Sequence, residues 1–343
     1  IKTGSAQKIA ETIVDGLGER RAVAAISIAT IIICTVGVFI DISVITVAPI
    51  ALAIGEKAGL SKSGVLLAMI GGGKAGNIIS PNPNTIALSE AFQLDLSALI
   101  FKNIVPALFA LIVSILLSAF LSGKPGDAIT KRDLEGAPNK TLPALLPSIA
   151  GPLAVIALLA LRPIAGIAID PLLALPLGGF LCILSTGCGK DAKECIEFGL
   201  SKVVGVAILL IGTGAVAGII KASALQKDVI ALLETMHMPA FVLAPLSGIL
   251  MGGATASTTA GATVAAQTFS AALLEAGIPA LSAAAMIHAG ATVIDSLPHG
   301  SFFHATGGSV FMDIKKRMAL IPFEALIGLT STVTAVILYL LRL

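Results

Sequence analysis

The sequence is poor in charge and in aromatic residues that carry a polar group. Its 343 residues include no tryptophan and one tyrosine, and Asp, Glu, Lys and Arg together make up only 12% of them. Soluble domains carry about 25% charge, so this chain has too little polar side chain to cover a water-facing surface. The shortage excludes a soluble enzyme and a disordered chain. A net charge of +2 is too small to predict a nucleic-acid partner, and we expect none.

Cysteine is scarce as well. The four cysteines, Cys34, Cys182, Cys188 and Cys195, include no CxxC pair, and the histidines form no HExxH motif. This spacing favours apolar packing of the thiols over a metal or redox site. We therefore expect no metal and no cofactor.

In place of charge the sequence has apolar residues, which make up 56% of the chain and give a mean hydropathy of +0.99. They form long continuous runs rather than the ~10-residue alternating segments of a membrane β-barrel. The pattern predicts an all-α polytopic membrane protein surrounded by the lipid bilayer. Because tryptophan is absent, Lys and Arg must mark the ends of its helices.

Glycine and proline, 35 and 17 residues, lie inside or beside many of the apolar runs. Backbone that leaves the helix at membrane depth is tolerated where it lines a cavity, as in transporters with broken helices. The composition therefore predicts interrupted membrane helices.

The first 121 residues read as one repeat. Its second apolar run, 22–55, is too long for one span and too short for two, so we interpret it as a re-entrant hairpin with Asp41 at its tip. The next run is interrupted between Gly71 and Thr85, where two prolines remove backbone donors. In order, the expected elements are helix 5–18, re-entrant hairpin 22–55, broken helix 63–92 and span 98–121.

A polar stretch at 122–143 reads as a cytoplasmic loop and separates this repeat from the second half, 144–343. A charged loop is expected at 188–197 and a polar stretch at 221–237. The expected elements of the second half are spans 144–161, 171–187 and 200–220, re-entrant hairpin 240–275, broken helix 280–309 and span 319–341.

The two halves repeat the order of hairpin, connector and broken helix. Gly73 corresponds to Gly290 and Pro81 to Pro298, at a constant offset of 217 residues. Interrupted apolar segments at corresponding places in two halves are the strongest sequence indication of a transporter site.

Basic residues predict how the halves are oriented. When the first hairpin enters from the cytoplasm, nearly every basic cluster falls on the cytoplasmic side, as the positive-inside rule expects. The second hairpin then enters from outside, so the repeat is inverted. The basic residues placed inside are Arg20, Arg21, Lys57, Lys62, Lys124, Lys131, Arg132, Lys140, Lys190, Lys193, Lys315, Lys316 and Arg317.

Two carboxylates lie within the apolar segments, where charge is costly and indicates function. Asp41 is a candidate for proton coupling, or else a structural partner of a buried donor. Asp295, in the second break, is a candidate together with His299, because histidine titrates near neutrality; the alternative is that Asp295 caps the following half-helix. His288 and His304 are more simply read as packing residues.

Lys74 is the single basic residue inside a predicted membrane segment and is a charge partner for Asp41, Asp295 or an anionic substrate. Half-helix N-termini that converge at the midplane favour a carboxylate. The polar residues around these ends are the substrate-binding candidates: Asn77, Ser80, Asn82, Asn84, Thr85, Thr255, Ser257, Thr258, Thr259 and His299.

Three stretches together resemble the gluconate permease (GntP-type) family of the ion-transporter superfamily. They are KTGSAQKIAETIVDGLGERRA with the tip Phe39-Ile40-Asp41, the Gly/Pro-rich break at 71–85, and the most specific element, Asp-Ser-Leu-Pro-His-Gly at 295–300. The resemblance covers essentially the whole chain. Members of that family carry additional N-terminal spans, so we expect this chain to lack roughly their first quarter.

The resemblance implies proton-coupled symport of a small carboxylate, such as a sugar acid or a related hydroxy- or amino-carboxylate, across the bacterial inner membrane. It also implies a homodimer with a fixed scaffold and a moving transport domain. The first break reads SPNPNT at 80–85, where sugar-acid permeases have a His- and Pro-rich stretch. The resemblance therefore does not single out gluconate.

Three other functions remain open. Sodium coupling is possible, since unwound carbonyls bind Na⁺. A membrane-embedded aspartyl hydrolase would use Asp41 and Asp295, but no GxGD element surrounds either residue, so we expect no enzyme. A channel would need a continuous polar pore, and the hairpins resemble plugs.

Overall fold

The protein is helical wherever its structure is described. The computed structural model describes residues 2–123, 127–134, 141–167, 169–224, 227–228, 231–232, 235 and 237–343. These residues form helices and short connections. The one β-type pairing among them is an isolated antiparallel bridge between Ser61 and Ala128. The prediction of an all-α fold is confirmed. Parts of the predicted 122–143 loop (with Lys124 and Lys140) and of the 221–237 stretch lie outside the described residues.

Residues 2–122 fold into helices joined by short turns. The first hairpin turns at Val36–Phe39, where Gly37 has a φ of +98° that suits glycine. The second half of the first broken helix begins with Pro83 at the first helical position, where the missing N–H costs nothing. The helices are α1 (Ser5–Leu17), α2 (Ala22–Thr35), α3 (Ile40–Lys57), α4 (Lys62–Asn77), α5 (Pro83–Ala91), α6 (Leu96–Lys102) and α7 (Ile104–Ser122).

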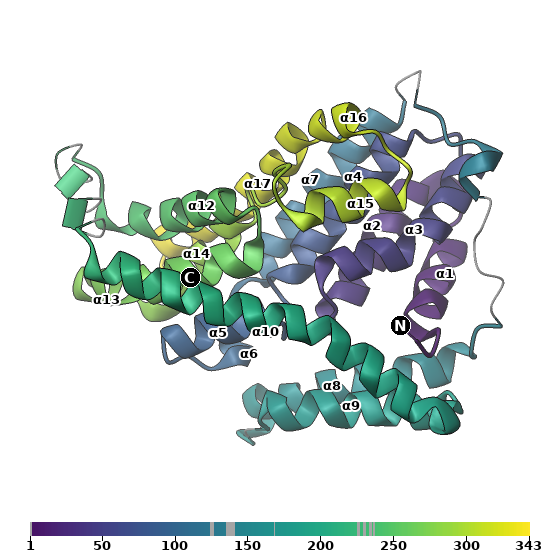
Figure 1. Cartoon of the computed structure of the whole chain (residues 1–343), viewed down its shortest axis with the longest axis horizontal. Helices are drawn as coiled ribbons and strands as arrows, with labels where there is room; N and C mark the ends of the chain where they lie inside the picture. The colour runs from purple at the N-terminus through teal and green to yellow at the C-terminus, as the bar shows by residue number, and fades with distance from the viewer. Residues whose placement is uncertain are drawn as a thin grey trace.

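The second half adds a pair of helices before the repeat returns. The helices are α8 (Leu145–Ala165), α9 (Pro171–Ser185), α10 (Ala192–Ala222), α12 (Leu243–Thr255), α13 (Thr258–Glu275), α14 (Ala280–Ala291), α15 (Ser301–Ser309), α16 (Ile314–Met318) and α17 (Ile321–Leu340). In Figure 1, α8 and α9 lie side by side, and α10 runs along the molecule from this pair toward α13.

The packing is reciprocal between the repeats. Within each repeat the first hairpin helix packs on the first part of the broken helix: α2 on α4, and α12 on α14. Between repeats, α5 packs on the second hairpin at α13, while α15 packs on the first hairpin at α3, and α7 packs on α17. This exchange brings both hairpin tips to both breaks.

The glycines of α4 do not break the helix, contrary to the expected interruption from Gly71. The helix continues through Asn77, and the break is confined to 78–82. The glycines serve close packing instead. A Cβ built on Gly72 would lie 2.3 Å from the backbone oxygen of Ser27, and one on Gly76 would lie 2.8 Å from that of Ile31. These glycines let α2 and α4 approach at backbone distance.

Two other boundaries differ from expectation. The predicted 98–121 span is divided at Asn103 into α6 and α7, and the Asn103 amide donates to the Ile78 carbonyl in the first break at 3.1 Å. The expected charged loop 188–197 shrinks to a short turn, Cys188–Asp191, because α10 begins at Ala192.

Within the described part of the chain, three helical stretches are long and apolar enough to cross a membrane: Ile104–Ser122, Cys188–Ile220 and Ile314–Leu340. On α7 the exposed side chains are large and apolar, including Leu108, Phe109, Ile112, Leu116 and Phe120. An outer surface of this kind suits contact with lipid rather than water.

Segment 127–134 contacts the start of α4 and the short helix α16, which the charge pattern places in the cytoplasm. Lys62 at the start of α4 pairs with Asp133 at 2.6 Å, and Lys316 of α16 pairs with Asp127 at 2.9 Å. Asp127 also accepts from Ser63 N at 2.9 Å. Burial opposes ionisation of Asp133, but the hydrogen bonds from Lys62 and Thr130 outweigh it and hold the pKa of Asp133 below its ordinary value.

Candidate functional site

A cavity of about 260 Å³ lies where the two hairpin tips meet the two breaks. Corresponding segments of both repeats contribute to it, although their residues are far apart in the chain. Its lining residues are Phe39, Ile40, Asp41, Ile42, Ile45, Asn77, Asn84, Ala256, Ser257, Thr258, Thr259, Asp295, Ser301 and Phe302.

Four helices begin at this cavity. The first turns of α3, α5, α13 and α15 contribute Asp41, Asn84, Thr258 and Ser301 to its wall. Each helix N-terminus carries about half a positive charge and unpaired backbone donors. The N-cap of α15 is Gly300, which offers no side chain to bond those donors. The cavity is therefore electrostatically suited to an anion.

Asp295 is bonded by the side chains of Lys74, Thr258 and Ser296. Its Oδ1 lies 2.5 Å from Lys74 Nζ and 3.1 Å from Ser296 Oγ, and its Oδ2 accepts from Thr258 Oγ1 at 2.5 Å. Both members of the ion pair are buried, with side-chain exposures of 1% and 2%. Of the partners foreseen for Lys74, the structure brings Asp295 to it. The alternative that Asp295 caps α15 is wrong, because Gly300 holds the N-cap position.

Lys74 also donates to the backbone carbonyl of Thr292, the C-cap of α14. It therefore joins the first broken helix to the end of the second. Lys74 lies behind Asp295 and does not itself line the cavity.

Asp41 lies in the first turn of α3, at the hairpin tip as expected, and lines the cavity. It is half-buried rather than enclosed. Asp41 and Asp295 thus line one cavity from different parts of the chain, and Asp295 is paired with Lys74.

An asparagine cluster shapes the first break. The Asn77 side-chain oxygen accepts from Asn82 Nδ2 at 2.7 Å and from Asn84 Nδ2 at 3.1 Å. The Asn82 oxygen caps α5 by accepting from Asn84 N and Thr85 N at 3.0 and 3.1 Å. Asn77 and Asn84 line the cavity, whereas Asn82 supports them from behind.

Three predicted substrate contacts bond to backbone and lie outside the lining. Ser80 Oγ donates to the Cys34 carbonyl at 2.7 Å and so ties the break to the first hairpin. Thr85 Oγ1 donates to the Ser80 carbonyl at 2.7 Å. Thr255 Oγ1 donates to Met251 O at 2.7 Å. Their roles in the structure are local, whereas Ser257, Thr258 and Thr259 line the cavity.

The predicted pair of Asp295 with His299 does not form among the described contacts. His299 is exposed and lies outside the cavity lining. His304 Nε2 bonds to the Pro298 carbonyl at 2.7 Å. His288 is fully buried in α14, and neither of its ring nitrogens has a hydrogen-bond partner in the described part of the chain.

Sequence reasoning missed Ser301 and Phe302, which line the cavity from the first turn of α15. The signal was present: Pro298 and Gly300 mark the start of a half-helix, and the residues just inside such a start face the ligand. No group of three His, Cys, Asp or Glu residues that could hold a metal ion occurs within the described residues.

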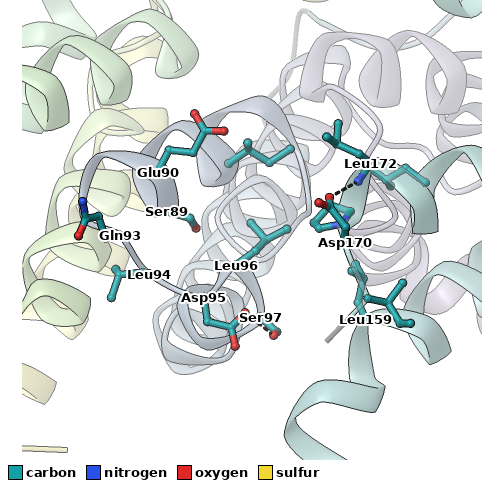
Figure 2. Close-up of a pocket in the computed structure, with 14 residues that line it drawn as sticks. Ser89, Glu90, Gln93, Leu94, Asp95, Leu96, Ser97, Leu159, Asp170 and Leu172 are labelled. Atoms are coloured by element: carbon teal, nitrogen blue, oxygen red, sulfur yellow. Dashed lines mark hydrogen bonds between the residues drawn. The ribbon is translucent and has the colours of Figure 1, made fainter. Parts of the chain in front are cut away.

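A larger cavity of about 620 Å³ lies between the α5–α6 turn and α8–α9 (Figure 2). Its ionisable residues are the carboxylates Glu90, Asp95 and Asp170. Asp170 caps α9 by accepting from Leu172 N at 2.8 Å, and Asp95 accepts from Ser97 Oγ at 3.2 Å. A wall of this charge repels an anion, so the cavity between the breaks is the better candidate for one.

Comparison with known proteins agrees with this architecture. The family described as "GntP family permease" matches residues 1–176. An "Uncharacterized transporter" of Haemophilus influenzae is 51% identical over 339 residues, covering 99% of this chain and 81% of that protein. The crystal structure of the Alcanivorax borkumensis YdaH transporter, titled as having an unusual topology, matches with a TM-score of 0.66 at 12% identity, over 99% of this chain and 84% of that one. That structure supports the fold alone. The resemblance drawn from the motifs is confirmed, and the chain belongs to the GntP family of permeases.

Proposed function

We propose that this membrane permease is a proton-coupled symporter of a small organic anion, a sugar acid or a related hydroxy- or amino-carboxylate. The observation that carries the proposal is the convergence of four helix N-termini and both breaks on one cavity. Its volume of about 260 Å³ lies just below the ~300–1,000 Å³ of drug-sized ligand sites. A small carboxylate matches that size.

Anion binding follows from the lining. The carboxylate of the substrate accepts from the uncapped first turn of α15, and its hydroxyl or amino groups bond to Asn77, Asn84 and the Ser257–Thr259 tip. The unpaired oxygen of Asn84, buried without a partner among the described residues, is an acceptor available to a substrate hydroxyl.

Proton coupling follows from Asp41. Asp41 is the second carboxylate that lines the cavity, beside Asp295, which is ion-paired with Lys74. Binding a substrate carboxylate beside ionised Asp41 brings like charges together at low dielectric. Protonation of Asp41 removes that repulsion. The proton therefore binds with the anion and is released with it, and His299, which is exposed, has no direct part in this exchange.

The hydrolase alternative is less well supported. Two catalytic carboxylates must share one proton, whereas Asp295 forms an ion pair with Lys74. A transporter needs no such dyad. We further propose that the hairpins are re-entrant, that the protein spans the bacterial inner membrane several times with 127–134 inside, and that it works as a homodimer.

The test is transport by the full chain in proteoliposomes without sodium. A panel of gluconate, other hydroxy-carboxylates and amino-carboxylates is scored for saturable uptake, counterflow and proton entry reported by an internal dye. We expect at least one carboxylate to enter with protons. Asp41→Asn should keep counterflow and lose accumulation driven by a pH gradient. Asp133→Asn, at the distant 127–134 segment, is the matched control and should keep both.

Other outcomes favour other functions. Accumulation by Asp41→Asn under a pH gradient removes Asp41 from the coupling step. Uptake that requires external sodium favours the sodium-coupled alternative. Flux that does not saturate and shows no counterflow indicates a channel.

A further inference from the structure

We infer that the ammonium group of Lys74 permanently occupies the position that a sodium ion would take at the second break. The inference deepens the proposed function, on which it rests, because it assigns the cation of this position to the protein itself. It stands on the geometry around Lys74 Nζ.

The oxygen atoms around Lys74 Nζ are those expected of a sodium site in a transporter. They come from the carbonyl of Thr292 at the C-cap of α14 and from Oδ1 of Asp295, 2.5 Å away. The hydroxyls of Ser296 and Thr258 bond to the same carboxylate. Half-helix C-terminal carbonyls together with a carboxylate coordinate Na⁺ where broken helices bind ions. The helix dipole adds negative potential at this end of α14.

Burial makes the lysine a permanent occupant rather than a transient one. Lys74 is among the largest fully buried side chains of the chain, at 2% exposure. It approaches from α4, a helix of the other repeat, whose close packing on α2 and α7 fixes its backbone. To admit sodium at this point, the ammonium group would have to leave a buried carboxylate without a partner.

The cation that the second break requires is therefore part of the chain itself, the ammonium group of Lys74. Wild-type protein needs no sodium to hold the second break together, and removal of the ammonium group should create a sodium site from the oxygens left behind. Oδ1 of Asp295 is one of those oxygens.

The test measures thermal stability without substrate, so it is independent of whether any carboxylate is transported. The purified full chain is heated in NaCl, KCl or choline chloride of equal ionic strength. Unfolding is followed with a thiol-reactive dye after the partly exposed Cys182, Cys188 and Cys195 have been replaced by serine, so that the dye reports the buried Cys34, which it reaches only when the chain opens. We expect the same midpoint in all three salts for wild type. We expect Lys74→Ala to be less stable in choline and to gain about 2–4 °C specifically in sodium.

Two controls separate the ion site from a general effect of losing a lysine. Lys62→Ala also removes the lysine of a Lys–Asp pair. That pair does not include a carbonyl at a helix C-cap, so no sodium effect is expected. Asp295→Asn added to Lys74→Ala should abolish the sodium gain. If Lys74→Ala does not fold, Lys74→Gln keeps much of the volume and should show the same gain.

The inference is overturned by either of two results. One is a sodium-specific rise in wild type as large as that of Lys74→Ala. The other is a folded Lys74→Ala or Lys74→Gln protein whose midpoint does not respond to sodium. Failure of every carboxylate in the transport panel would instead count against the proposed function and leave this measurement unaffected.

Discussion

Lys74 Nζ and Asp295 Oδ1 lie 2.5 Å apart although 221 residues separate them in the chain. The pair joins the first broken helix to the second break and is buried on both sides. A buried ion pair contributes little net stability over apolar residues, but leaving one of its charges alone is costly. The pair therefore makes assembly of the two repeats dependent on both residues being present.

Replacing Lys74 by methionine is expected to destabilise the protein by roughly 3–5 kcal/mol, because Asp295 is left buried without its cation. The double variant Lys74→Met/Asp295→Leu should be much less affected than the sum of the single changes, since it leaves no buried charge. Denaturation of the three variants and wild type in a salt without sodium provides the comparison. Additive losses would show that the pair is not coupled.

Much of this arrangement could be predicted from the sequence. The hairpins and broken helices follow from apolar runs of unusual length with charged or proline-rich interruptions. The isolation of Lys74 among apolar residues predicts that it is a charge partner. Whether it pairs with Asp41 or with Asp295 depends on how the repeats pack, which no local pattern encodes.

Other features could not be predicted because the same residue types serve two purposes. The run of glycines that includes Gly72 predicts a helix break, yet Gly72 is helical and permits close contact with α2. The basic cluster at 315–317 predicts only the side of the membrane, whereas in the structure Arg317 is 1% exposed and paired with Glu324. His299 follows Pro298 in a recognised motif, yet it is exposed. In each case tertiary packing determines the conformation or the burial of the residue, which cannot be deduced from residue spacing in the sequence.

Gly72→Ala should destabilise the protein by about 1–3 kcal/mol, because its Cβ would lie 2.3 Å from a backbone oxygen of Ser27 and would force α2 and α4 apart. Gly212→Ala on α10, where a Cβ meets nothing within 4 Å, should be neutral or stabilising by up to ~1 kcal/mol. Thermal midpoints with the thiol-reactive dye measure both. Equal effects of the two substitutions would contradict the packing role of Gly72.

The asparagine cluster predicts a separation of structural and binding effects. Asn82→Ala removes the cap of α5 and should cost about 1–2 kcal/mol of stability, visible as a lower thermal midpoint. Asn84→Ala removes a cavity-lining amide and should mainly raise the KM for the transported carboxylate, by roughly tenfold for one lost hydrogen bond of ~1.4 kcal/mol. Kinetics and stability are measured on the same preparations. An Asn82→Ala protein of normal stability would argue against the capping role.

The buried Arg317–Glu324 pair anchors the last helices. Both terminal nitrogens of the guanidinium group bond to the Glu324 carboxylate, Nη2 at 3.3 Å, and the group lies 4.8 Å from the Phe303 ring centre in α15. Arg317→Lys cannot reproduce the two-bond geometry, so we expect a loss of about 1–3 kcal/mol. The exposed neighbour Lys315 is the matched site, and Lys315→Ala should change stability by less than ~0.5 kcal/mol. Comparable losses at both positions would refute a specific role for the pair.

The 127–134 segment should be released by acid. Because its hydrogen bonds lower the pKa of Asp133 from the ordinary value of 3.8, this carboxylate stabilises the folded segment above pH 3.8, and the contribution is lost as pH falls through the lower folded pKa. Hydrogen–deuterium exchange of peptides covering 127–134, corrected for intrinsic rates, should therefore accelerate below pH 3.8. Lys62→Ala removes the main donor and should shift the onset to higher pH, whereas Asp133→Asn should abolish the pH dependence and exchange quickly throughout. Protection that persists unchanged into strong acid, in wild type and Asp133→Asn alike, would mean that the backbone bond from Lys62 N to Asp127 O at 2.8 Å holds the segment without help from the side chains.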